Sequence, residues 1–393
     1  DAPGRRSLQL MNFDCMDCDS GDLVDRFSFE SSPPGMDTLY GGFFYDWAGI
    51  GGVTYNDGFT GTLGRELAQL DDTNQWGLSL ARQYRSVDER SDRAAILNEQ
   101  NRPVLEAGFQ LIRRTHSASI QSAEGLGALG GPASGAVLRD AQMWIPDLWV
   151  RMLWIPAYQH SLRLELEAVA IFGDIRHVGS ETPETSAELQ SRDIQQFGLA
   201  FESEYRYRQL VTGLNAGFAT GRDVSGEDAA ERTGWGVQDI GAVAGTGGDP
   251  NVTAFGFDPS YIVDMTMFRE IIGTVTNAIY INPYIQYDFF KAQANSIGFR
   301  LDGVYGTALN ADATPGGDSS IGLELATMLY YTAPNYRAGV NYAVLFPFGA
   351  LDAVEGRSRI PDVAEFYEFD PNFLESADAT IAHTLQFHLM WAF

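Results

Sequence analysis

Hydrophobic and polar side chains alternate along the last stretch of the chain, residues 380–393. Leu385, Phe387, Leu389 and Trp391 occupy every second position, and the positions between them hold Gln, His and Met. A period of two residues places successive side chains on opposite faces of a β-strand. The pattern therefore predicts a strand with one continuous apolar face.

The same alternation recurs throughout the chain. Leu162, Leu164 and Leu166, for example, alternate with charged residues. Many of these runs exceed the roughly five or six residues usual for strands of globular sheets, which weighs against a soluble β-sandwich. Aromatic residues near the ends of the apolar faces, such as Tyr305, are typical of the interfacial girdles of membrane barrels. The predicted strands lie at residues 7–15, 22–31, 37–51, 75–86, 103–114, 142–154, 161–175, 194–206, 208–220, 277–290, 296–309, 320–331, 336–348 and 380–393. These are fourteen strands, and sixteen is the alternative count.

Phe393 is the last residue of the sequence and completes the C-terminal pattern. A terminal Phe that follows apolar residues at alternate positions (Leu385, Phe387, Leu389 and Trp391) resembles the C-terminal insertion signal of bacterial outer-membrane β-barrel proteins of the porin type. The resemblance implies an all-β fold, a transmembrane antiparallel up-and-down β-barrel inserted by the barrel assembly machinery. A closed barrel also leaves no strand edge exposed, because its last strand pairs with its first.

We expect one barrel domain, residues 1–393. If both termini lie in the periplasm, long connections such as 177–192 and 349–378 fall outside the cell, and short turns such as 333–335 fall in the periplasm, as is usual for such barrels. Residues 88–101 are rather long for a periplasmic turn. They either form a short helix there or show that the predicted register is shifted.

Residues 221–276 make the longest connection. The first part is acidic and rich in glycine, which is typical of a loop. Asp258 with the following Pro259, and Gly273 further on, then mark the ends of a predicted helix. Loops of this length without a function are uncommon. We therefore expect an extracellular loop that folds into the lumen, and the alternative is that residues 261–272 add further strands.

Composition excludes several classes of protein. The formal net charge is −26 and Lys291 is the only lysine, so nucleic acid is a poor partner, because phosphate contacts require clusters of Lys and Arg. No run approaches the roughly 18 unbroken apolar residues of a spanning helix. The first residues carry no apolar signal sequence. We therefore expect a mature, exported protein of the bacterial outer membrane whose signal peptide has been cleaved.

Cys15 and Cys18 are the two cysteines and have C-x-x-C spacing. Without a surrounding βαβ pattern, this spacing favours a small loop disulfide over a redox motif. Nearby carboxylates offer oxygen ligands for a loop-bound Ca²⁺, although no Glu completes an EF-hand loop and a solvated acidic turn is the alternative. These carboxylates belong to Asp14, Asp17, Asp19 and Asp22. No other cofactor is implied.

Charged residues fall between the lipid-facing positions of the predicted strands. An Arg at the middle of a lipid face costs about 2–4 kcal/mol, so these residues are predicted to face the lumen. They either line a water-filled pore or form salt bridges that only stabilise the barrel. Arg269 and Glu270 would form part of a constriction if their loop folds inward. The candidate pore-lining residues are Glu106, Arg151, Arg163, Glu165, Glu167, Glu202, Glu204, Arg206, Arg269, Glu270, Arg300, Asp302, Glu324 and Arg337.

The predicted outer loops are acidic, with residues such as Glu181, Asp223 and Glu368. Such a mouth attracts cations, or binds lipopolysaccharide through divalent ions. We expect a modest cation preference, with outer-membrane lipid and lipopolysaccharide as partners.

The sequence contains no catalytic motif of the G-x-S-x-G, H-E-x-x-H, Walker or Rossmann type. None of its histidines lies in a local motif of outer-membrane enzymes, so we expect no enzyme. The resemblance implies a porin-like channel for passive diffusion of small hydrophilic solutes. The alternatives are a plugged structural or adhesive surface barrel and a substrate-specific outer-membrane transporter.

Overall fold

The computed structural model describes residues 25–49, 73–120, 136–176, 191–222, 251–258, 261–292, 295–352 and 378–391. Several expectations fall on other residues and stay predictions. They are the strand at 7–15, the disulfide and Ca²⁺ candidates around Cys15 and Cys18, acidic loop positions such as Glu181, Asp223 and Glu368, and Phe393.

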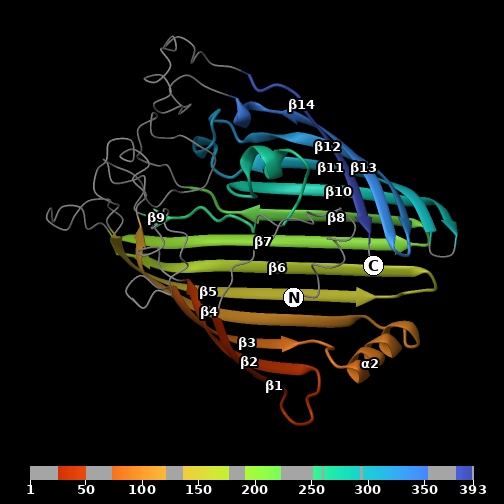
Figure 1. The fold of residues 1–393 in the computed structure, drawn as a ribbon, viewed down its shortest axis with the longest axis horizontal. Coiled ribbons are helices and arrows are strands. Elements are labelled where there is room, and N and C mark those ends of the chain that lie inside the picture. The colour runs from red at the N-terminus through yellow and green to blue at the C-terminus, as the bar shows by residue number, and fades with distance from the viewer. Residues whose placement is uncertain are drawn as a thin grey trace, which may run out of the picture.

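The described residues form one sheet in which antiparallel strands pair in chain order. Figure 1 shows the long strands side by side from β1 in red to β14 in blue. The strands are β1 (Asp25–Ser31), β2 (Leu39–Gly49), β3 (Thr73–Arg82), β4 (Val104–Ile120), β5 (Ala136–Trp154), β6 (His160–Ile175), β7 (Arg192–Tyr207), β8 (Leu210–Ala219), β9 (Asn251–Val252), β10 (Ala278–Ala292), β11 (Asn295–Ala308), β12 (Ser320–Ala333), β13 (Tyr336–Pro347) and β14 (Ala382–Trp391). The hydrogen-bonded path through these strands passes over β9, which pairs in parallel with β7. This order confirms the predicted fold class, an all-β, up-and-down antiparallel barrel.

The predicted strands from 22–31 onward correspond to long strands of the structure, with ends that differ by a few residues. Strand β5 begins earlier than predicted, because its first residues still pair with the end of β4. The predicted helix between Asp258 and Gly273 is wrong in length. It is reduced to one π-helix, η2 (Met267–Ile272), which Gly273 ends in the left-handed conformation at φ 91°. Residues 261–272 form no strand, so they do not raise the strand count.

The connections at the two ends of the sheet differ in length. At one end, the strands are joined through residues 32–38, 83–103, 155–159, 208–209, 293–294 and 334–335. At the opposite end, most connections are longer, and the one between β8 and β10 comprises residues 220–277. Further 3-10 turns, η3 (Ala311–Ala313) and η4 (Gly349–Leu351), lie at that end.

The predicted short helix in the β3–β4 connection is confirmed as α2 (Val87–Asn98). Ser86 caps its first turn, since the Ser86 hydroxyl accepts a hydrogen bond from the Glu89 N–H. The Glu89 carboxylate in turn accepts from the Ser86 N–H, which completes a capping box. Tyr40 of β2 also donates its hydroxyl to Glu89 at 2.8 Å, so the helix is fixed to the sheet at its start.

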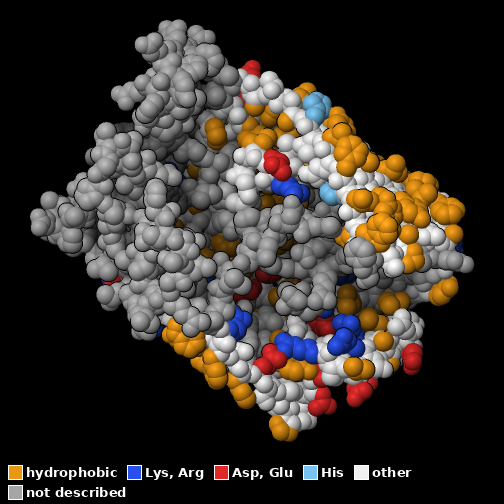
Figure 2. Space-filling view, viewed as in Figure 1, with side chains coloured by type: hydrophobic (Ala, Val, Ile, Leu, Met, Phe, Trp, Pro, Cys, Tyr) orange, Lys and Arg blue, Asp and Glu red, His pale blue; other side chains and the backbone are white. Residues whose placement is uncertain are grey.

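The two faces of the sheet differ in chemistry. The inner face is the one against which residues 261–277 pack, and it carries the charged and amide side chains of the strands. On the outer face, large apolar side chains are exposed on neighbouring strands, among them Leu325 and Leu329 of β12 and Phe387 and Leu389 of β14, at 49%, 55%, 74% and 64% exposure. Figure 2 shows hydrophobic side chains gathered along the right-hand part of the molecule. Soluble monomers rarely expose an apolar patch larger than a few hundred Å², so this face requires an apolar partner.

No helix in the described part of the chain is long and apolar enough to cross a membrane.

Tyrosine rings of β10 cover glycines of the neighbouring strand β8 on the inner face. A Cβ atom at Gly217 would overlap the ring of Tyr280, and one at Gly213 would overlap the ring of Tyr284. The register places Gly217 directly opposite Tyr280. The absence of a side chain at each glycine therefore leaves room for the tyrosine ring.

Replacing Gly217 with Ala is expected to lower the free energy of unfolding by about 1–3 kcal/mol, because Tyr280 must leave its position. Urea-induced unfolding in lipid vesicles, followed by tryptophan fluorescence, measures the change. Gly41→Ala is the matched control, since a Cβ at Gly41 meets no atom within 4 Å. Equal stability of the two variants would contradict this account of the packing.

Candidate functional site

Polar side chains form a continuous row across the inner face. Each residue of the row is the direct cross-strand neighbour of the next, so the row follows the hydrogen-bonding direction from β4 to β10. Its members in order are Glu106, Arg151, Glu165, Glu202, Asn215 and Asn282. Most are buried, and Glu106 and Asn282 are only 1% and 2% exposed. Charges removed from water in this way require close partners.

Glu106 joins helix α2 to the wall, which is the sheet formed by the long strands. The Nε of Arg151 donates to the Glu106 carboxylate at 2.9 Å, and the Arg151 Nη2 makes a second contact with the same oxygen. Arg93 of α2 donates to the other carboxylate oxygen at 3.2 Å. Removing one member of such a buried group leaves the others uncompensated, at a cost of about 3–5 kcal/mol. This ion triad therefore holds α2 over the short-turn end of the inner face.

Arg163 links two carboxylates on β6 and β7. Its Nη1 lies 2.8 Å from Glu165 and 3.2 Å from Glu202. The indole N–H of Trp149 also donates to Glu165 at 2.6 Å. Without Arg163 the two directly opposed glutamates would repel each other, so the arginine lowers their mutual repulsion.

Arg300 and Asp302 form a second buried ion pair on β11. The Arg300 Nε donates to both Asp302 oxygens at 2.9 Å, and its Nη2 donates to Oδ1 at 2.6 Å. The guanidinium also lies over the ring of Tyr284, 3.9 Å from its centre. Such stacking is favourable because the ring face is electron-rich.

Residues 261–277 are fastened to this wall through their backbone. The carboxylate of Glu324 on β12 accepts hydrogen bonds from the N–H groups of Met265, Thr266 and Met267 at 2.8–3.1 Å. Asn282 of β10 donates to the carbonyl of Val263 at 3.0 Å. The N–H groups of Met265, Thr266 and Met267 are therefore bound by Glu324 and not by carbonyl groups of a preceding helical turn. This explains why the observed helix, η2, is shorter than the predicted one.

The segment also reaches strands farther apart along the sheet. The Tyr261 hydroxyl donates to Glu202 of β7 at 3.2 Å. The hydroxyls of Thr266 and Thr384 of β14 lie 2.7 Å apart. The segment thus follows the inner face from β7 to β14.

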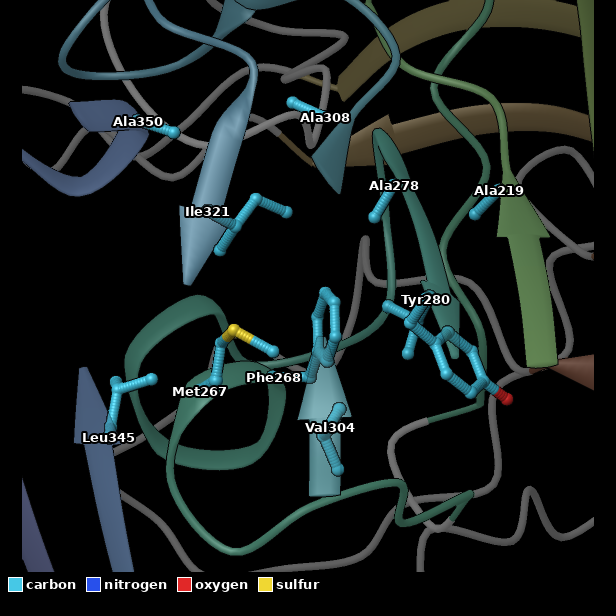
Figure 3. Packing of buried hydrophobic residues seen from close by; sticks show 11 residues of the cluster. Ala219, Met267, Phe268, Ala278, Tyr280, Val304, Ala308, Ile321, Leu345 and Ala350 are labelled. Atoms are coloured by element: carbon cyan, nitrogen blue, oxygen red, sulfur yellow. The ribbon is translucent and has the colours of Figure 1, made fainter. Parts of the chain in front are cut away.

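An apolar cluster lies beneath the segment. Met267 and Phe268 of η2 belong to one buried cluster with Ile321, Leu345 and Val304 of the wall (Figure 3). Met267 and Phe268 are 0% and 2% exposed, so each contributes about 1.5–3 kcal/mol of apolar burial. Polar and apolar contacts together hold η2 in one position.

Two ionisable groups of the segment have displaced pKa values. Burial, reinforced by the charge of Glu324, raises the pKa of Asp264 well above its usual range, although the N–H groups of Phe268 and Arg269 act in the opposite direction. Burial also raises the pKa of Tyr261 well above its usual range, as does the neighbouring Tyr280. Tyr261 therefore keeps its proton and remains a donor to Glu202.

A recess of about 50 Å³ lies between the segment and the wall. By volume it has room for roughly three to five water-sized groups. Its charged and amide lining residues are Asp264, Arg269, Arg300, Asp302, Glu324, Asn341 and Gln386. The recess thus brings carboxylates and guanidinium groups from one loop segment and four strands to one place.

The structure places the predicted pore-lining residues on the inner face of the sheet, with Arg269 and Glu270 on η2. It unites most of them in the clusters above, whereas Glu167 is exposed and Arg206 pairs with its near neighbour Glu204 at 3.3 Å. Arg337 lies over the ring of Tyr330. Pore lining itself stays a prediction.

Other interior residues escaped the sequence analysis. Asp46 is fully buried and accepts hydrogen bonds from Arg26 and Gln75, both at 2.6 Å. Its place between Tyr45 and Trp47 follows the alternation, so the pattern could have revealed it. Asp264 lies in an irregular segment, where no pattern predicts its position.

No family model and no curated protein matches the chain. Among solved structures, 28 chains match. One is the copper transporter OprC, at 13% sequence identity and a TM-score of 0.35. The match covers 92% of this chain and 57% of that chain, so this chain spans little more than half the length of that protein. A likeness of this degree carries no argument about function.

Glu324→Gln is expected to loosen the segment. A glutamine offers one carbonyl oxygen to three N–H groups and turns its own NH₂ group toward them, at a cost of about 1–3 kcal/mol. Hydrogen–deuterium exchange measured on peptides covering 261–277 should show protection lowered by about ten- to a hundredfold.

The matched control for this variant is Glu204→Gln, since the Glu204 carboxylate accepts from Arg206 and Tyr284 of the wall. It should leave the exchange of the segment unchanged. If both variants exchange like the unaltered protein, Glu324 does not hold the segment.

Proposed function

We propose that this protein is an outer-membrane channel through which small hydrophilic solutes diffuse passively. The observation that carries the proposal is the separation of chemistry between the two faces of one long-stranded sheet. Apolar side chains cover the outer face, and the ion pairs lie on the inner face. Lipid can contact the apolar outer face and water can solvate the charged inner face, as in a barrel that encloses an aqueous path.

The length of the strands supports a membrane location. Strands β10, β11 and β12 have 15, 14 and 14 residues, against the roughly 9–11 that a tilted strand needs to cross the hydrocarbon layer. Aromatic side chains also lie near strand ends, where Tyr336 contacts Trp391 edge to face with ring centres 6.2 Å apart. We infer that outer-membrane lipid and lipopolysaccharide contact this surface. The proposal requires neither a catalytic residue nor a cofactor.

Charge supports a preference for cations. The chain has 52 acidic and 26 basic side chains, and its net charge of −26 attracts cations toward any opening. Glu270 lies on η2 at the inner side of the wall and its side chain is 58% exposed. It is therefore the carboxylate of the segment best placed to meet a passing ion.

The fastening of residues 261–277 favours a second candidate. A segment held by β7, β10, β12 and β14 occupies part of the interior. This arrangement also suits a plugged structural barrel, or a transporter that opens only for its own substrate. The two candidates differ in current, because only an open channel conducts without a substrate.

Single-channel recording in planar bilayers under a KCl gradient tests the proposal. We expect steady current with a reversal potential that favours K⁺. Glu270→Lys should move the reversal potential toward zero, since it reverses an exposed charge at the segment. Val87→Lys on α2 is the matched control, because Val87 is 78% exposed and belongs to α2, not to residues 261–277.

Absence of current, from protein shown to be folded by its heat-dependent gel mobility, would overturn the open-channel proposal in favour of the second candidate. Equal shifts of the reversal potential in Glu270→Lys and Val87→Lys would show that residues 261–277 do not line the ion path.

A further inference from the structure

The recess beneath the inward segment contains opposite charges at close quarters. Asp264 and Glu324 bring two carboxylates together, and burial leaves them 6% and 0% exposed. Their oxygens accept backbone hydrogen bonds, which orient the carboxylates. A positively charged group in the recess would lower their mutual repulsion.

Arg300 supplies the complementary positive group. Its Nε and Nη2 are taken by Asp302, but its Nη1 is buried and has no hydrogen-bond partner among the described residues. The whole residue is 1% exposed. A guanidinium donor without an acceptor is costly in the interior, so an acceptor supplied from outside the chain would bind favourably.

Asn341 adds an unpaired acceptor to the same recess. It is 6% exposed, and its Oδ1 has no partner among the described residues, whereas its Nδ2 lies 3.2 Å from His388. The register places Arg300 opposite Met328 on β12, and Met328 opposite Asn341 on β13. The unsatisfied donor and the unsatisfied acceptor therefore lie in one row across the floor of the recess.

We propose that this recess binds a small zwitterion of the α-amino acid type. Its carboxylate accepts from Arg300, and its ammonium lies toward Asp264, Glu324 and Asn341. The inference rests on the proposed channel, because it names the class of solute that the interior recognises.

Size and charge define this class. Roughly three to five water-sized groups fill the recess, and glycine has five non-hydrogen atoms. A simple anion meets the carboxylates of Asp264, Asp302 and Glu324, and a simple cation meets the guanidinium groups of Arg269 and Arg300. Only a solute with both charges satisfies both sides of the recess.

Equilibrium binding of ¹³C-glycine to the folded full-length protein, followed by NMR line broadening, tests the inference. Acetate and ethylammonium are the probes that carry one charge each. We expect glycine to bind at least tenfold more tightly than either probe. Arg300→Gln should weaken glycine binding at least tenfold.

Arg26→Gln is the matched control, because Arg26 pairs with Asp46 on the inner face and does not line the recess. It should leave glycine binding unchanged. If Arg300→Gln fails to fold, Asn341→Leu keeps a similar volume, removes the Oδ1 acceptor and should still weaken binding severalfold.

Glycine binding no tighter than that of acetate, or binding unaffected by both recess variants, would overturn the inference and leave a recess filled by water. The two proposals fail separately. Glycine binding without single-channel current would support the zwitterion site and contradict the open channel. Current without glycine binding would support the open channel and contradict the zwitterion site.

Discussion

An outer face that is apolar on every long strand is the constraint on which the rest of the structure depends. Because side chains alternate along a strand, a wall with an apolar outside must carry its charges on the inside. Those charges then lie close together, where an unpaired one is costly. Three groups pair these charges: the Arg93–Glu106–Arg151 triad, the Arg163 cluster and the Arg300–Asp302 pair.

The inward segment obeys a related rule. Irregular backbone is tolerated inside a barrel only where the wall or water binds its N–H and C=O groups. Glu324 meets this need with one carboxylate that accepts from three successive N–H groups, and Met267 and Phe268 add apolar contact below. A wall residue that looks like one more lumenal charge in the sequence thus determines where the segment lies. The recess beside it is a consequence of that position.

Much of the wall could be predicted from the sequence, because period-two alternation is a local signal. Alternation alone assigns Glu106, Arg163 and Glu324 to the face opposite their apolar neighbours. Alternation cannot predict which residues far apart in the sequence contact one another. Glu324 binds residues nearly sixty positions earlier, and η2 is short because the wall takes N–H groups that a helix would need. Alternation also says nothing of Asp264 or Tyr261, whose roles come from tertiary contacts in an irregular segment.

Spin-label accessibility along β14, in protein reconstituted into lipid vesicles, tests the central claim most directly. Single cysteines would be introduced at Leu385, Gln386 and Leu389 in a background with Cys15 and Cys18 replaced by Ser. The account predicts high collision with oxygen, which dissolves in lipid, at Leu385 and Leu389. It predicts low collision with oxygen at Gln386, which lies on the inner face. Equal accessibility at all three positions, or preferential collision of Leu385 and Leu389 with a water-soluble nickel reagent, would contradict a lipid-facing wall.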